Sequence, residues 1–321
     1  MSLLIYAESA EGKFKKVAFE LASYAKKVAE SLGTTVTAVT INAGDVSELA
    51  KYGVDKVLKV KNEALSGFSA KAYADVIKQA AQKEGAKVVV LSSTTDSIYL
   101  SSLVAVGLDA GFASNVVGLP ISTNPFQVKR TAFSNKAFTI TEITTNVKVL
   151  GLAKNSYGII ENNVSIAEED FNPTIDAADF SVKVTAVEKS SGKIAIADAD
   201  IVVSGGRGLK GPENWGMIEE LASVLGAATA CSKPVSDLGW RPHAEHVGQT
   251  GKPVATNLYI AIGISGAIQH IAGINSSKVK VVINNDPEAP FFKVADYGVV
   301  GDAFEIVPQL IEKLKAFKAQ H

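Results

Sequence analysis

Four short segments combine glycine or small polar residues in patterns that could bind a ligand. They lie at residues 205–208, 247–251, 264–270 and 283–290. Three of them follow runs of apolar residues that are typical of buried strands. In open parallel α/β sheets, ligands bind at the carboxyl ends of the strands. We therefore expect these segments to form one ligand site along a sheet edge.

The first two segments combine glycine with polar side chains. In Gly205-Gly206-Arg207-Gly208, the glycines would let the backbone approach a ligand, and Arg207 would give a forked contact to a phosphate or carboxylate. In residues 247–251, two glycines surround Gln249 and Thr250, so backbone N–H groups and two side chains would meet one ligand edge. The alternatives are a tight turn with a solvated arginine and an ordinary surface loop.

The other two segments follow later predicted strands. Residues 264–270 predict a helix whose start holds Ser265 and Gly266, where unpaired N–H groups suit a pyrophosphate. His270 would then lie about one turn into the helix, either as a structural residue or beside a redox cofactor. Asn284 would either bind a ligand at the strand end or form part of a turn.

Other kinds of site have little support in the sequence. His243 and His246 are three residues apart, without a nearby cysteine or a third histidine, so we predict no metal site. No G-x-S-x-G motif surrounds Ser232, so we predict no catalytic nucleophile. The chain also lacks a GxxxxGK[ST] phosphate loop.

Composition restricts the class of protein. The chain has 321 residues, enough for two domains, and a net charge of −1, which gives no general attraction to nucleic acid or anionic membranes. The single cysteine, Cys231, cannot form an internal disulfide or a thiolate cluster. Apolar runs stay below the ~18 residues of a membrane span, and the start shows no targeting segment. We expect a soluble bacterial protein of the cytoplasm.

Strand–helix alternation predicts an α/β fold with two domains, each a mostly parallel sheet flanked by helices. Apolar spacing predicts a helix from 17 to 32 and a second helix after Ser69. Three β-branched segments predict antiparallel strands added to the first domain: residues 128–133, 137–141 and 147–152. Strands are otherwise expected at 3–7, 35–41, 54–60, 88–91, 201–204, 258–262 and 279–283.

A polar stretch marks the expected domain boundary. Residues 188–193 read Glu-Lys-Ser-Ser-Gly-Lys, which predicts a linker. The first domain would span 1–188 and the second 189–321. Helices are expected at 213–225 and 307–319 in the second domain.

Together these segments resemble the alpha subunit of electron transfer flavoproteins. The resemblance covers residues from about 196 to 321 in order and spacing, and the first domain matches more loosely at 128–131 and 135–137. The matching strings include SGGRGLK from Ser204, VGQTGK from Val247, YIAIGISGAIQH from Tyr259 and DPEAP from Asp286.

The resemblance implies FAD, held mainly by a doubly wound second domain, while the first domain is of the nucleotide-hydrolase type and faces a partner. The implied FAD contacts are Arg207, Ser232, Lys233, Val247, Gly248, Gln249, Thr250, Ser265, Gly266, Ala267, Ile268, Gln269, His270, Asn284 and Asp302. It also places Thr250 by flavin N5 and His270 by the C2 carbonyl oxygen, where a donor stabilises negative charge. Lys233 stands where the family usually has arginine, and lysine lacks the planar fork.

The function implied is that of an electron carrier without substrate chemistry of its own. It would form a heterodimer with a beta subunit, accept electrons from acyl-CoA or other dehydrogenases, as in fatty acid β-oxidation, and pass them to a membrane-linked quinone oxidoreductase. A bifurcating version, with a second flavin in the beta subunit, stays open. A hypothesis of another class is an AMP-binding regulatory module, based on the first domain's strand–helix alternation.

Overall fold

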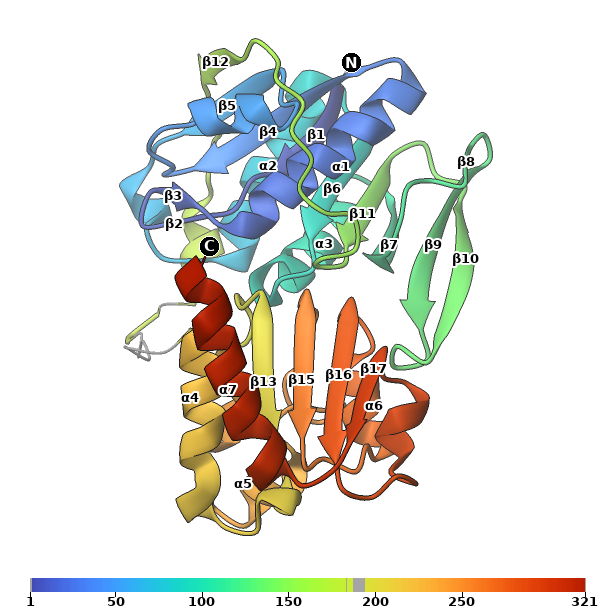
Figure 1. Cartoon of the computed structure of the whole chain (residues 1–321). Helices are drawn as coiled ribbons and strands as arrows, with labels where there is room; N and C mark the ends of the chain where they lie inside the picture. The colour runs from blue at the N-terminus through green and yellow to red at the C-terminus, as the bar shows by residue number, and fades with distance from the viewer. Residues whose placement is uncertain (1, 183, 187–193, 321) are drawn as a thin grey trace. The chain divides into compact units, whose positions relative to one another are not determined.

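The computed structural model describes residues 2–182, 184–186 and 194–320 (Figure 1). The chain folds into two compact units, which we call the N-terminal unit (1–132 and 137–188) and the C-terminal unit (133–136 and 189–321). Each unit contains a mostly parallel sheet with helices on both faces, which confirms the predicted fold class. The predicted linker at 188–193 lies outside the described residues.

The sheet of the N-terminal unit has ten strands within the described residues. In spatial order, the seven strands β7, β11, β6, β1, β4, β5 and β12 are each parallel to their neighbours within this series. In contrast, β9 is antiparallel to β7, β8 and β10. In spatial order they are β10 (Ala137–Ile143), β9 (Phe126–Ala132), β7 (Gly111–Val116), β11 (Lys148–Leu152), β6 (Val88–Ser92), β1 (Ser2–Tyr6), β4 (Thr35–Ile41), β5 (Lys56–Val60) and β12 (Ala167–Asp170), with β8 (Ser122–Thr123) beside β9. A separate small pair joins β2 (Ser9–Ala10) and β3 (Lys13–Phe14).

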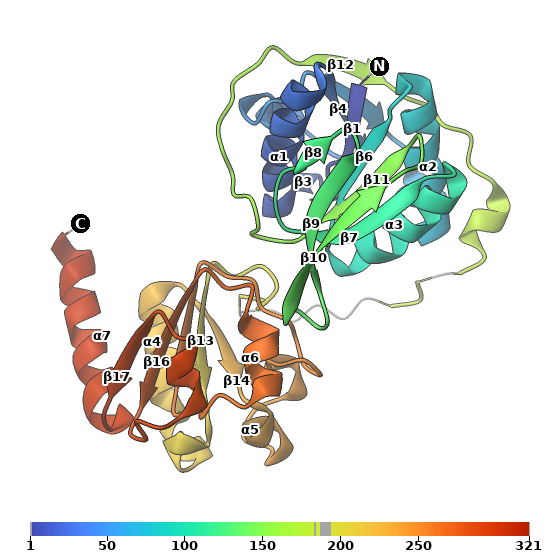
Figure 2. The same ribbon diagram turned by 90° about the vertical axis from the view of Figure 1, so that its right-hand side faces the viewer.

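Helices cover both faces of this sheet. Figure 2 shows α1 (Lys16–Leu32) on one face and α2 (Ala70–Glu84) and α3 (Thr95–Gly107) on the other. Leu21, Tyr24 and Val28 are spaced three or four residues apart, so they fall on one side of α1 and are buried against the sheet. Short 3-10 helices are η1 (Ser47–Lys51), η2 (Glu63–Leu65) and η3 (Ala177–Phe180).

The prediction of three antiparallel strands is confirmed for β9 and β10 and wrong for β11. That strand lies between β6 and β7 and is parallel to both. Its residues Val149, Leu150, Gly151 and Leu152 are all buried, as in a central parallel strand covered by helices on both faces. In the sequence, the hairpin of β9 and β10 is inserted between β7 and β11, which are neighbours in the parallel sheet. Because β11 follows this hairpin directly, the sequence suggested that it was a third antiparallel strand.

The C-terminal unit contains a five-stranded sheet in which every neighbouring pair is parallel. Its order is β14 (Ala228–Cys231), β13 (Ile201–Gly205), β15 (Leu258–Ile262), β16 (Val279–Asn284) and β17 (Tyr297–Val300). The helices are α4 (Gly216–Leu225), α5 (Lys233–Asp237), α6 (Ile268–Ile274) and α7 (Ala303–Gln320), with 3-10 turns η4 (Arg207–Leu209), η5 (Pro212–Trp215), η6 (His243–Glu245) and η7 (Pro290–Lys293).

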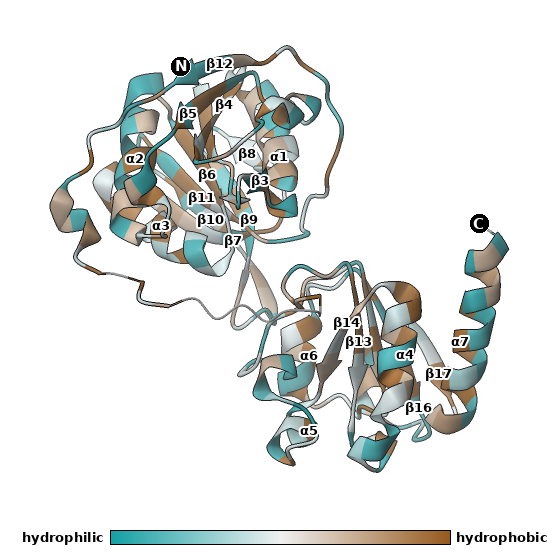
Figure 3. Ribbon diagram, turned by 90° about the vertical axis from the view of Figure 1, so that its left-hand side faces the viewer, coloured by the Kyte–Doolittle hydropathy of each residue, from teal (hydrophilic) through white to brown (hydrophobic). Residues whose placement is uncertain are grey.

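Alternate residues of the strands face different layers of this unit. Ile260 and Ile262 pack with α4 and α7, whereas Tyr259 and Ala261 point to the opposite face, where α6 lies (Figure 2). Both α4 and α7 carry hydrophobic and hydrophilic residues, as expected for helices with one side on a sheet (Figure 3). Among the described residues, no helix combines the length and apolarity that crossing a membrane requires.

Candidate functional site

The parallel sheet of the C-terminal unit brings the carboxyl ends of its strands to one edge. In Figure 1 the arrowheads of β13, β15 and β16 all point the same way. Arg207 follows β13, Ser232 follows β14, and Ser265 comes shortly after β15. Asn284 is the last residue of β16, and Asp302 lies two residues beyond β17. Residues that are far apart in the sequence therefore lie along this one edge.

The loop at 247–251 reaches the same edge although it follows no strand. The Val247 N–H donates to the carbonyl of Cys231 at 3.0 Å, and the Gln249 N–H donates to the carbonyl of Gln269 at 2.8 Å. Gly273 of α6 lies against Gly248, because a Cβ on Gly273 would be 2.5 Å from the Gly248 Cα. The loop is therefore in contact with α6 and with the end of β14.

Three glycines allow the loops after β13 and β15 to touch through their backbones. The Gly206 N–H donates to the carbonyl of Ile262 at 2.9 Å, and the Gly208 N–H donates to that of Gly263 at 3.1 Å. A Cβ on Gly206 would lie 2.1 Å from the Gly263 carbonyl oxygen, and one on Gly208 would lie 2.7 Å from the Gly263 Cα. We call Gly206, Gly208 and Gly263 the glycine cradle. No larger side chain fits there while the loops stay in contact.

Asn284 and Asp302 hold neighbouring loops in place. The Asn284 Nδ2 donates to the carbonyl of Ile264 at 3.1 Å, and its Oδ1 accepts from the Asp286 N–H at 3.0 Å. The Asp302 Oδ1 accepts from the Phe304 N–H at 2.9 Å in the first turn of α7, and its Oδ2 lies 3.9 Å from the Lys210 Nζ. Both side chains thus support the backbone of the edge.

The predicted site residues divide by exposure into two groups. The buried ones are Ser232, Val247, Gly248, Gly266, His270 and Asn284, and Asp302 is half-buried. The exposed ones offer two apolar side chains and six polar or charged ones: Arg207, Lys233, Gln249, Thr250, Ser265, Ala267, Ile268 and Gln269.

The predicted helix start at Ser265 and Gly266 is wrong. Helix α6 begins at Ile268, and the two residues belong to the turn before it. Gly266 has a φ of +87°, which a helix does not accommodate, and a Cβ there would meet the Phe291 N at 2.6 Å. The Ser265 carbonyl instead accepts from the Phe291 N–H at 3.0 Å. His270 is consequently in the first turn of α6.

His270 is a neutral histidine buried beneath this edge. Its side chain is 6% exposed, and its Nε2 lies 2.9 Å from the Tyr259 hydroxyl. Its Nδ1 is buried without a hydrogen-bond partner among the described residues. Burial, with a smaller effect of His246, lowers the pKa of His270 to about 4, so the ring is uncharged at neutral pH.

The neighbouring titratable groups do not form a second reactive centre. Burial, followed by the charge of His243, lowers the pKa of His246, and no group of three metal-ligating side chains occurs among the described residues. Burial and then the Glu245 charge raise the pKa of Cys231 to about 12, so the thiol stays protonated and unreactive.

We expect folding stability to fall between pH 6.5 and about 4 because of His270. Its pKa in the folded state is about 4, below its ordinary value of 6.5, so unfolded chains bind the proton more readily as pH falls through this window. Between pH 7.5 and 5 the loss should be about 2 kcal/mol, and His270→Gln should lack this component. Urea unfolding of both proteins at the two pH values measures it, and equal pH dependence would contradict the assignment.

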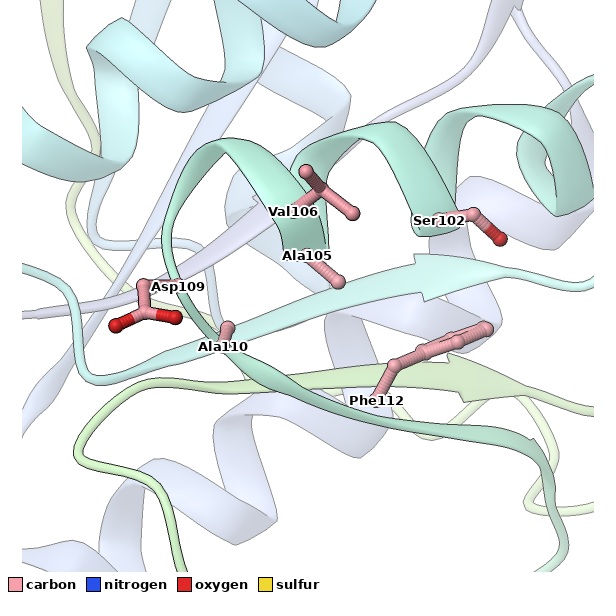
Figure 4. Close-up of a pocket in the computed structure, with 6 residues that line it drawn as sticks. All are labelled: Ser102, Ala105, Val106, Asp109, Ala110 and Phe112. Atoms are coloured by element: carbon pink, nitrogen blue, oxygen red, sulfur yellow. The ribbon is translucent and has the colours of Figure 1, made fainter.

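A shallow pocket in the N-terminal unit is separate from these residues. It lies where α3 ends and β7 begins, and it is lined by Ser102, Ala105, Val106, Asp109, Ala110 and Phe112 (Figure 4). Asp109 is the only charged residue of this lining, so the pocket does not favour an anion.

Comparisons with known proteins match both units. The family described as electron transfer flavoprotein FAD-binding domain matches residues 195–275, and the electron transfer flavoprotein domain matches residues 3–188. The electron transfer flavoprotein subunit alpha of Thermoanaerobacterium thermosaccharolyticum is 36% identical over 98% of both chains. That of Syntrophomonas wolfei is 36% identical over 97% of this chain and 98% of its own, and that of Bacillus subtilis is 34% identical over 98% and 97%.

Sequence reasoning did not identify Tyr259 as part of the site. One feature of the sequence could have indicated it: Tyr259 is the single tyrosine in an otherwise aliphatic strand. A buried tyrosine hydroxyl usually needs a hydrogen-bond partner, which here is His270.

Proposed function

Because the chain belongs to the electron transfer flavoprotein alpha-subunit family, we propose that it is a carrier that receives electrons from partner dehydrogenases at FAD and passes them to a membrane-linked quinone oxidoreductase. The main support is the convergence of the four segments at 205–208, 247–251, 264–270 and 283–290 at one edge of the FAD-binding domain. The alpha subunits among its relatives imply a beta subunit, with which the chain would form a heterodimer.

Two features of the edge fit a bound dinucleotide. The glycine cradle joins the loops after β13 and β15 through their backbones, and Arg207 and Lys233, both exposed at this edge, offer positive charge to phosphate groups. FAD supplies the redox chemistry when it is bound, while the protein binds, orients and tunes it. The full set of residues that we propose to hold it is Arg207, Ser232, Lys233, Val247, Gly248, Gln249, Thr250, Ser265, Gly266, Ala267, Ile268, Gln269, His270, Asn284 and Asp302.

The acidic side chains of the edge favour a carrier over a flavin enzyme with its own substrate. A substrate base needs a carboxylate or imidazole that is available for proton transfer. Asp302 caps α7, and Asp286 accepts from the Glu288 N–H at 3.0 Å. His270 is buried against Tyr259. These groups therefore serve the local structure, and the chemistry is left to FAD and its redox partners.

The corresponding edge of the N-terminal unit disfavours the AMP-binding alternative. Glu8, which lies two residues beyond β1, is 3% exposed and contacts the Ser92 hydroxyl at the end of β6 and the Thr94 and Ser97 hydroxyls at the start of α3. Lys15 pairs with the same carboxylate at 3.3 Å. The start of a helix suits a phosphate, but here a carboxylate of the chain already occupies it and would repel a second anion.

The test of this function is electron transfer from a dehydrogenase. The chain, co-expressed with its beta subunit, should be yellow, and a fatty acyl-CoA together with its dehydrogenase should bleach the flavin absorbance. The acyl-CoA alone should not. Bleaching by a small substrate without a dehydrogenase would indicate an enzyme, and a colourless protein that retains AMP would favour the regulatory module.

Lys233→Gln should lower the one-electron reduction potential of the bound FAD. Lys233 is exposed at the first position of α5, and its positive charge offsets the negative charge that reduction adds nearby. We expect a shift of about 60 mV, a tenfold change in the redox equilibrium. Lys233→Arg should keep the potential at least as high as in the wild type, because guanidinium keeps the positive charge at this position.

Spectroelectrochemical titration measures this shift, and Lys278→Gln provides a matched control. Lys278 is exposed immediately before β16, at the opposite edge of the same sheet, so its replacement should leave the potential unchanged. Equal potentials for Lys233→Gln and the wild type would place Lys233 away from the flavin.

A further inference from the structure

An ion pair between Arg241 and Glu245 is largely shielded from solvent in the C-terminal unit. The Arg241 Nε donates to the Glu245 Oε2, and its Nη2 donates to the Glu245 Oε1, both at 2.8 Å. The two side chains are 16% and 11% exposed. A guanidinium that binds both oxygens of a carboxylate fixes the orientation of its partner as well as the distance.

Glu245 lies at the start of the loop at 247–251. It is the last residue of η6, two residues before the loop begins. At the base of the loop, the His246 carbonyl accepts from the Lys252 N–H at 2.8 Å. Because His246 follows Glu245 directly, the ion pair with Arg241 holds the chain at the point where the loop is closed.

The same guanidinium lies over Trp215, which packs against the end of β13. The Arg241 Cζ is 5.3 Å from the centroid of the Trp215 ring, and Trp215 is 3% exposed. A Cβ on Gly205, the last residue of β13, would lie 2.6 Å from the Trp215 Cη2. The Arg241 Nη2 also lies 3.3 Å from the Glu219 Oε1 in α4. Arg241 is therefore one residue away, through Trp215, from the segment at 205–208.

We propose that Arg241 is a positioning residue that connects the segments at 205–208 and 247–251 and keeps both in the arrangement that binds FAD. The inference rests on the proposed function, because it assumes FAD at this edge. Arg241 acts through Trp215 on one segment and through Glu245 on the other, so it needs no contact with the cofactor. A guanidinium suits this role, since its flat face covers an aromatic ring while its edge binds a carboxylate.

Hydrogen exchange tests this connection without relying on FAD. The measurement uses the flavin-free complex of the full chain with its beta subunit. In Arg241→Met, which removes the charge and keeps a long unbranched side chain, amide exchange should become about tenfold faster at both 205–210 and 245–252. Exchange in β16 should stay unchanged. Faster exchange in only one of the two segments, or in neither, would overturn the proposal.

The affinity for oxidised FAD measures the consequence for the cofactor. In a flavin fluorescence titration, Arg241→Met should raise the dissociation constant about tenfold, or about 1.4 kcal/mol. Arg241→Lys should recover part of the affinity, because an ammonium keeps the charge but lacks the planar fork. Lys315→Met, which removes the exposed ion pair with Glu220, should leave the affinity unchanged.

Ile311→Ala separates positioning from general destabilisation of the C-terminal unit. Ile311 lies in α7, is 4% exposed and belongs to the core between the sheet and α4, so its truncation lowers stability. The dissociation constant of FAD should stay unchanged in this variant. An equal loss of affinity in Ile311→Ala and Arg241→Met would overturn the proposal, because destabilisation alone would then explain the effect.

A double-mutant cycle with Glu245→Gln assigns the effect to this ion pair. In a Glu245→Gln background, Arg241→Met should weaken FAD binding much less than it does in the wild type. An equal loss in both backgrounds would overturn the proposal. If Arg241→Met does not fold, hydrogen exchange in Arg241→Lys decides the question by the same two segments. If the wild-type complex retains no FAD, the proposed function fails, whereas hydrogen exchange still tests the connection between the segments.

Discussion

Gly206→Ala is expected to weaken FAD binding at least a hundredfold, or about 3 kcal/mol. A Cβ at this position would lie 2.1 Å from the carbonyl oxygen and 2.7 Å from the carbonyl carbon of Gly263. Both atoms are backbone, so they cannot rotate away as a flexible side chain would. The loops after β13 and β15 must therefore separate, which breaks the hydrogen bond of 2.9 Å from the Gly206 N–H to Ile262.

Gly216→Ala is the matched control for this substitution. Gly216 is the first residue of α4 in the same unit, its φ is −52°, and nothing lies within 4 Å of the Cβ that alanine would add. FAD affinity should stay unchanged and stability should rise by about 0.5–1 kcal/mol, because alanine is the better helix former. Flavin fluorescence titration and urea unfolding measure both variants. An unchanged dissociation constant in Gly206→Ala would show that the cradle lies outside the FAD site.

Arg207→Ala should weaken FAD binding about ten- to a hundredfold, since losing one charged hydrogen-bond partner costs about 1.5–3 kcal/mol. Arg207 begins η4, its side chain is exposed, and no ion pair holds its guanidinium among the described residues. Beside the glycine cradle, it is placed to bind the pyrophosphate in a forked contact. Arg207→Lys should recover the charge and only part of the affinity.

Lys210→Ala distinguishes a direct contact from a general effect of charge. Lys210 lies three residues after Arg207, and its Nζ is 3.9 Å from the Asp302 Oδ2. Its replacement by alanine removes one positive charge from the same loop, as Arg207→Ala does. We expect a much smaller loss of affinity than for Arg207→Ala, measured by equilibrium dialysis at two salt concentrations. Equal losses of FAD affinity for the two variants would show that Arg207 acts only through the general positive charge of the loop, and not through a direct contact.

Most of the fold could be predicted because local patterns specify it. The spacing of Leu21, Tyr24 and Val28 gave α1, and Gly33 ends that helix in the left-handed conformation. Helix α3 lacked such a pattern, because its apolar residues lie all round it and Ile98 and Val106 are exposed. Strand β7 was not predicted, because most of its residues are only partly buried and show no clear apolar pattern. The parallel pairing of β11 could not be predicted from its own residues, because it depends on which strands lie beside it.

The candidate site was predictable to the extent that its residues follow strands. A parallel sheet must gather such segments at one edge, and the structure brings the three that follow strands there. The loop at 247–251 follows no strand and joins them through hydrogen bonds to Cys231 and Gln269. The helix start was misplaced because Gly266 adopts a positive φ that no local pattern revealed. The contact between Tyr259 and His270 joins residues 11 positions apart on a strand and a helix, so it appears only when α6 packs on the sheet.

Hydrogen exchange with and without FAD most directly tests whether this edge of the C-terminal unit holds the cofactor. Mass spectrometry of peptides from the full chain in complex with its beta subunit follows each segment separately. Adding FAD to the flavin-free complex should slow exchange at residues 205–210, 247–251 and 264–270, where backbone N–H groups line the edge. It should leave exchange at β1 and α3 unchanged. Protection confined to the N-terminal unit, or no protection of the three segments when FAD is bound, would contradict the account.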